Sequence, residues 1–176
     1  MSISLPTHPA EDVCRRLRDD PLTAAMFSGG IYTDHGGGDG NDVHPINPVD
    51  TPDAYLADGD FKTLRPCLLI SVSTDVPISG GAQRQVVLRL GGYQGAGYSE
   101  IRDGMARVRQ VLHKTNSGTY WPSRLRDTAL GYYIEYLDTP GSGLTDASLI
   151  TGNGKRPACY EWSRFMVYTE PVTEPA

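Results

Sequence analysis

The sequence predicts an α+β domain in which a mainly antiparallel sheet of about four strands, in two pairs, packs against one amphipathic helix. Two observations support this prediction. Residues 98–114 carry apolar side chains at helical spacing. Alternating apolar residues, typical of strands with one buried face, lie before that helix in 67–90 and after it in 129–168. At 176 residues the chain has the length of one domain, so we expect 1–176 to be a single domain.

Two helices are expected near the N-terminus. Over 7–19, Thr7 is a suitable cap and a proline stands in the first turn, where it is tolerated. Asp20 followed by Pro21 has the pattern of an N-cap and a first helical residue, which predicts a second short helix through Met26. The glycines that follow are expected to end this helix and lead into a short apolar segment.

A hairpin is expected next, with strands over 67–74 and 83–90 joined by a connection that contains Gly80-Gly81. The principal helix follows over 98–114, with Ser99 as a plausible cap. Its apolar stripe comprises Ile101, Met105, Val108 and Leu112. Basic residues lie off this stripe and make one helix flank basic in an acidic protein: Arg102, Arg107, Arg109 and Lys114.

The second strand pair is expected over 129–137 and 158–168, joined by a long polar loop over 141–156. Aromatic residues are concentrated in the last third of the chain: Tyr120, Trp121, Tyr132, Tyr133, Tyr136, Tyr160 and Trp162. Core packing is expected to hold those that share one strand face. Tyr133 alternates to the other face beside Glu135, a mixture that suits a protein interface. A flexible tail is expected over 169–176.

Residues 34–62 show no period and contain repeated glycine and proline punctuation. A long segment of this kind inside a compact domain is usually functional, so we expect an extended arm that orders on a partner. Within it, Gly37-Gly38-Asp39-Gly40-Asn41-Asp42 matches the start of a calcium-binding β-roll repeat. Such sites need stacked copies, and His44 occupies the position of a large apolar residue. A flexible acidic loop is therefore the favoured interpretation.

No catalytic residue, cofactor site or metal site is predicted. The glycines around Asp34, His35, Asp42 and His44 give these possible ligands no fixed geometry. His113 suits the negative end of its helix rather than the role of a base. The stretch 91–97 precedes a helix as phosphate-binding loops do, but lacks the G-K-[ST] ending. We therefore expect a protein that is not an enzyme.

Composition narrows the class of partner. The formal net charge is −5, from 16 basic and 21 acidic residues, which disfavours general binding to a nucleic-acid backbone. The acidic net charge is still compatible with a passage through which DNA slides without adhering. The three cysteines have no CxxC spacing and are expected to be reduced, structural thiols. Neither a secretion signal nor a membrane span is expected.

Three short motifs stand in order along the chain: Val13-Cys14-Arg15-Arg16-Leu17-Arg18-Asp19-Asp20-Pro21-Leu22, Ser28-Gly29-Gly30-Ile31-Tyr32 and Arg65-Pro66-Cys67-Leu68-Leu69-Ile70. They resemble the helix, the D-P-x-L/T step, the G-G-x-I/V-Y exit and the Pro-led strand of tail-completion proteins from long-tailed, siphovirus-type bacteriophages. The order of hairpin, helix and second strand pair that follows is similar to the tail terminator group. The segments 34–62 and 141–156 are extra to that pattern.

The resemblance implies a structural virion protein of the phage tail or neck, made in the cytoplasm of the host bacterium. It implies a homo-oligomeric ring, typically a hexamer, that caps the tail tube, ends its polymerisation and meets the head–tail connector. DNA would be only cargo in the lumen. A connector or stopper protein of the neck is the alternative in the same setting. A calcium- or glycan-binding module that uses the loop from Asp39 to Asp42 is the alternative from another class.

Overall fold

A computed structural model describes residues 8–33, 64–78, 83–95, 98–112, 115–116, 119–120, 123–125, 132–145 and 158–169. Its helices are α1 (Pro9–Asp19), α2 (Pro21–Met26) and α3 (Ser99–Leu112). The long strands are β2 (Cys67–Ile78), β3 (Gln83–Gln94), β7 (Tyr132–Thr145) and β8 (Ala158–Thr169). The short strands are β1 (Ile31–Thr33), β4 (Thr115–Asn116), β5 (Thr119–Tyr120) and β6 (Ser123–Leu125).

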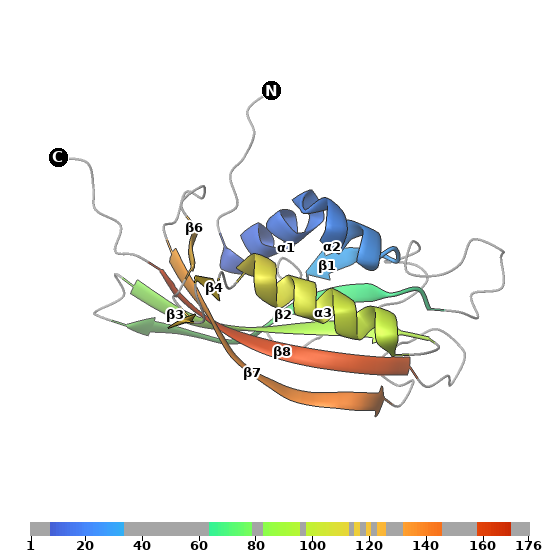
Figure 1. The fold of residues 1–176 in the computed structure, drawn as a ribbon. Coiled ribbons are helices and arrows are strands. Elements are labelled where there is room, and N and C mark those ends of the chain that lie inside the picture. The colour runs from blue at the N-terminus through green and yellow to red at the C-terminus, as the bar shows by residue number, and fades with distance from the viewer. Residues whose placement is uncertain are drawn as a thin grey trace, which may run out of the picture.

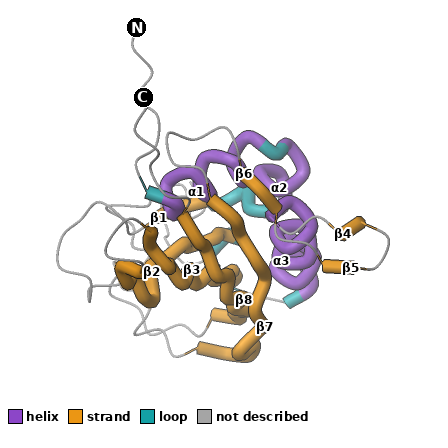
Figure 2. Tube along the Cα trace, turned by 90° about the vertical axis from the view of Figure 1, so that its left-hand side faces the viewer, coloured by secondary structure: helices purple, strands orange, loops and turns teal. Residues whose placement is uncertain are grey.

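The α+β class is confirmed, and the three helices lie together on one face of the main sheet (Figures 1 and 2). The order of strands is β1-β2-β3-β8-β7-β6, with a separate small pair, β4-β5. The four long strands are antiparallel, as predicted. The sheet as a whole is mixed and contains more strands than predicted, because β1 joins β2 in parallel and β6 joins β7.

The parallel pair β1–β2 brings two of the distant sequence motifs together. Gly29 donates its backbone N–H to the carbonyl of Pro66 at 2.8 Å, and Leu68 donates to the carbonyl of Gly30 at 3.0 Å. Gly30 adopts φ of +104°, a conformation that favours glycine. Three strand residues were too few to show a period in the sequence, so this edge pairing was not predicted.

The prediction of a loop beginning at residue 141 is wrong. Strand β7 continues to Thr145, and Gly141 pairs with Trp162. Irregularities in register on either side of Asp138 absorb extra residues of β7 before the pairing resumes. Pro140 and the glycine after it look like loop punctuation in the sequence, whereas in the structure they belong to a bulged strand. The rest of the predicted loop lies outside the described residues.

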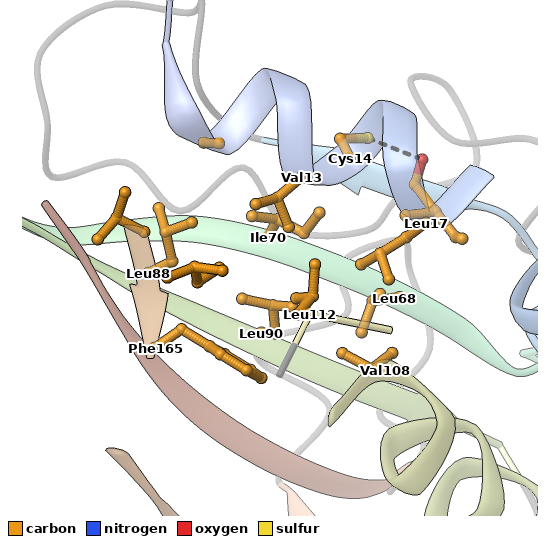
Figure 3. Close-up of a cluster of buried hydrophobic side chains, with 14 of the residues drawn as sticks. Val13, Cys14, Leu17, Leu68, Ile70, Leu88, Leu90, Val108, Leu112 and Phe165 are labelled. Atoms are coloured by element: carbon orange, nitrogen blue, oxygen red, sulfur yellow. Dashed lines mark hydrogen bonds between the residues drawn. The ribbon is translucent and has the colours of Figure 1, made fainter. Parts of the chain in front are cut away.

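The core lies between the helices and the sheet, and Figure 3 shows part of it. Every residue of the predicted stripe on α3 is fully buried, which confirms that interpretation: Ile101, Met105, Val108 and Leu112. From α1, Val13 and Leu17 contact the same core, and from the sheet Leu88, Leu90 and Phe165 do so. Burial of apolar surface against this common core is what holds the helices on the sheet.

The N-terminal helices begin largely as predicted. Asp20 accepts the N–H of Thr23 at 2.9 Å, which confirms it as the N-cap of α2. The cap of α1 is His8, whose Nδ1 accepts the N–H of Ala10 at 3.1 Å. The predicted cap, Thr7, lies outside the described residues. In the described part of the chain, no helix has the length and apolar character needed to cross a membrane.

Candidate interaction surface

Strand β8 presents its two sides to different surroundings. Ser163, Phe165 and Val167 are fully buried toward the helices. The alternate residues therefore lie on the opposite face of the sheet, which the described helices do not cover (Figure 1). We call this the helix-free face. Core packing holds Trp162 as expected, but in a second, smaller core on the helix-free face, where it packs against Leu64, Cys67 and Leu69. Tyr168, farther along the same face, is exposed.

An aromatic cluster occupies one end of the helix-free face, and we define it as Tyr93, Tyr160, Trp162 and Arg89. The indole N–H of Trp162 donates to the hydroxyl of Tyr93 at 3.0 Å. The ring centroids of Tyr160 and Trp162 are 5.0 Å apart. The guanidinium carbon of Arg89 lies 3.0 Å from the centroid of the Trp162 ring, which is a cation–π stack. Four side chains from two neighbouring strands thus hold one another in place.

A glycine allows the rings to lie against the sheet. Gly91 of β3 is directly opposite Trp162 of β8. A Cβ atom added at Gly91 would lie 2.8 Å from a ring carbon of Tyr93 and 3.0 Å from a ring carbon of Trp162. Both distances are shorter than a carbon–carbon contact allows. The aromatic cluster therefore depends on the absence of a side chain at this position.

Arg89 differs in its electrostatic surroundings from the two other arginines of β3 and β8, which are Arg84 on the helix side of the sheet and Arg164 on the helix-free face. Arg84 forms two hydrogen bonds to Asp75, at 2.8 and 2.6 Å, and Arg164 contacts Asp138 at 2.8 Å. Among the described residues, no carboxylate contacts the guanidinium of Arg89. Burial lowers the pKa of Arg89, which means that partial desolvation disfavours its charge. Arg89 is consequently a half-buried cation that lacks an anionic partner in the described part of the chain.

Apolar side chains extend the helix-free face away from the aromatic cluster. Gln85 of β3 pairs with Val76 on one side and with Tyr168 on the other, so all three share this face. Val76 is 46% exposed and Tyr168 is 39% exposed. Aromatic residues, arginine and exposed apolar groups on one surface have the composition of the central part of a protein interface.

The predicted basic flank of α3 is largely used within the chain. Arg107 donates to Asp20 at 2.7 and 3.0 Å and fixes α3 to the start of α2. Arg109 donates to Glu161 of β8 at 2.8 Å. These ion pairs correct the expectation that the flank is a uniform basic surface. Lys114 lies outside the described residues.

Glu161 is the buried member of a network that joins α3 to β8. It is 5% exposed and accepts hydrogen bonds from Arg109 and from the hydroxyl of Tyr98, the latter at 2.9 Å. Arg109 also donates to the hydroxyl of Ser163 at 3.1 Å. A buried carboxylate that accepts two hydrogen bonds, one of them from a cation, has its hydrogen-bonding and charge requirements met, and the network positions the helix over the sheet.

The remaining sequence candidates are distributed as follows. The loop with Asp39 and Asp42, and the possible ligands Asp34, His35 and His44, lie outside the described residues, as does His113. Among the residues that the structure describes, no group of three or more His, Cys, Asp or Glu side chains could hold a metal ion. The start of the glycine-rich stretch 91–97 is not a loop, because β3 continues through Gln94.

The three cysteines are free thiols, as predicted. Cys14 and Cys67 are buried, and burial raises the pKa of both. Cys159 is partly exposed.

No protein-family model matches the chain, and no curated protein matches it. The structure defines an α+β domain whose sheet carries helices on one face and, on the other, a small second core edged by partly buried aromatic residues and Arg89.

Proposed function

We propose that this protein is a tail terminator: a structural virion protein that forms a ring on the phage tail tube, ends tube polymerisation and joins the tail to the head connector. The observation that carries the proposal is the helix-free face. Its aromatic cluster is rigid, because ring contacts, a hydrogen bond and a cation–π stack fix it before any partner arrives. A preorganised surface of this composition loses little entropy when it binds another protein.

The local structure of the resemblance motifs supports the same proposal. The G-G-I-Y exit and the Pro-led strand form one unit, in which Ile31, Tyr32 and Thr33 pair with Leu68, Leu69 and Ile70. A Cβ atom at Gly29 would lie 2.8 Å from the Cβ of Arg65, so this glycine permits the close approach. The motifs thus have a common structural reason to occur together in one chain.

The proposed assembly is a hexameric ring in the tail or neck of the virion, with the tail tube protein and the connector as partners. Closed rings require heterologous contacts, in which one patch meets a different patch on the next copy. The acidic net charge of −5 suits a lumen through which DNA passes as cargo. The chain carries no catalytic role in this proposal.

Light scattering and electron microscopy of the purified protein test it. We expect a mass about six times the 19.1 kDa of one chain, rings in projection, and arrest of tail-tube polymerisation when the protein is added. A strict monomer at high concentration that also leaves purified tail tubes unbound would refute the proposal.

The alternative within the same setting is a connector or stopper protein of the neck. Binding to the head connector in the absence of tail tubes, with no arrest of tube growth, would favour that alternative.

A further inference from the structure

A second exposed patch lies on the helical side of the domain. Helix α2 has the sequence PLTAAM and contains no charged residue. Its Leu22 is 57% exposed, the highest value among the large hydrophobic residues of the described part. Asp19, at the end of α1, is exposed three residues earlier in the chain. Leucine exposed to this degree beside charged groups suits a contact surface better than a solvated one.

A further exposed carboxylate belongs to the same region. The ion pair between Arg107 and Asp20 fixes that side of α3 against the start of α2. Asp103 lies one turn before Arg107 and therefore on the same side of α3. No contact within the described residues joins Asp103 or Asp19 to a cation. We define Asp19, Leu22 and Asp103 as the helix patch.

The helix patch and the aromatic cluster are on opposite sides of the domain. The cluster lies on the helix-free face, and α2 belongs to the helical layer on the other face of the sheet (Figures 1 and 2). Two different patches on opposite sides cannot meet each other in a simple two-fold dimer. They can meet when each copy turns its helical side toward the sheet of the next, which is the heterologous arrangement that closes rings.

The charges of the two patches are complementary. The aromatic cluster offers Arg89, a half-buried cation without a carboxylate partner in the described part of the chain. The helix patch offers two carboxylates without a cationic partner there. Arg164 lies directly across from Arg89 in the β3–β8 register, but its charge is offset by Asp138, so Arg89 is the cation that the cluster offers to a partner. Tryptophan, tyrosine and arginine are also the residues most enriched at the energetic centres of interfaces.

We infer that the helix patch of one copy docks on the aromatic cluster of the next copy, with Asp19 and Asp103 facing Arg89 and with Leu22 beside Trp162. This inference rests on the proposed ring and names its subunit contact. The partner is a second copy of this chain. Docking gives Arg89 the anionic neighbours that the described part of its own chain does not supply, and it covers the exposed leucine.

Charge reversal on each side tests the contact. Arg89→Glu, and separately the pair Asp19→Lys with Asp103→Lys, are expected to raise the dissociation constant of the ring at least about tenfold, measured by light scattering across a dilution series. A 1:1 mixture of the two variants is expected to restore rings. Each reversed patch then meets a reversed partner at one interface, and unaltered patches meet at the next.

Arg102→Glu is the matched control for Arg89→Glu, because both replace one arginine by glutamate and so change the net charge equally. Arg102 stacks near Tyr98, at 5.2 Å from its ring centroid, on the flank of α3 that also carries Arg109 and faces β8. It is expected to leave the ring intact, and circular dichroism checks that every variant is folded.

The outcomes separate the two proposals. Rings that persist in both reversed variants, or a mixture of folded variants that stays dissociated, would overturn this contact and leave the ring proposal standing. A wild-type monomer would overturn both.

Discussion

Replacement of Gly104 by alanine tests how α3 is seated, because two effects oppose each other at this position. Alanine in a helix interior is favoured over glycine by about 1 kcal/mol. The added Cβ, however, would lie 2.7 Å from Cζ and 3.0 Å from Cε2 of Phe27. Phe27 is 2% exposed and cannot move toward solvent. Overpacking of this kind costs about 1–3 kcal/mol, so we expect Gly104→Ala to lower the free energy of unfolding by about 1 kcal/mol.

Urea denaturation followed by circular dichroism measures this change in the free energy of unfolding. Its sign is expected to depend on whether residue 27 is phenylalanine or a smaller residue. In a Phe27→Leu background the clashing ring carbon is absent, so Gly104→Ala is expected to stabilise the protein. Gln110→Ala, on the exposed side of the same helix, is the control and should change stability by less than about 0.5 kcal/mol. Stabilisation by Gly104→Ala in the wild-type background, or equal destabilisation in both backgrounds, would refute the reasoning.

Three further outcomes are expected. Arg109→Met should lower the free energy of unfolding, measured by urea denaturation, by about 2–3 kcal/mol, because Glu161 stays buried with one hydrogen-bond donor fewer. The value is at the low end for a buried ion pair because the guanidinium itself is only partly shielded from water. No change in the free energy of unfolding would mean that the ion pair is not formed. The Arg107 guanidinium lowers the pKa of Asp20, so its carboxylate stabilises the fold above about pH 4, and this stabilisation declines as the pH falls further. The loss of stability caused by Asp20→Asn should therefore be smaller at pH 3 than at pH 7. An equal difference in the free energy of unfolding between wild type and variant at both pH values would contradict this linkage. In Ellman's assay of the native protein, Cys159 should react first, and two thiols should react only after unfolding: Cys14 and Cys67.

Periodic segments with one buried face could be predicted from the sequence. The stripe on α3 was found because four apolar residues recur at helical spacing and all four contact the core. The Asp20–Pro21 step was found because capping depends on neighbouring residues alone. In both cases the local pattern and the tertiary environment favour the same structure.

The candidate surface was harder to predict because β8 is largely apolar on both sides. Two alternating sets, one with Trp162 and one with Phe165, are compatible with burial, and only the position of the helices decides between them. A usable signal was Arg164, which shares a face with Trp162 and is seldom turned toward a core. The bulged path of β7 around Asp138 could not be inferred, since it depends on pairing with a strand distant in sequence.

The position of β8 in the sheet affects the timing of assembly. This strand comes last in the described chain, yet it lies between β3 and β7, and it pairs residues as far apart as Gln85 and Tyr168. Pairing over such long separations in sequence is slow to form. Trp162 also belongs to β8, so a chain still being synthesised lacks both the strand that connects β3 to β7 and the surface proposed for docking. In the proposed assembly, copies that are unfinished or truncated before this strand would therefore be kept out of the ring.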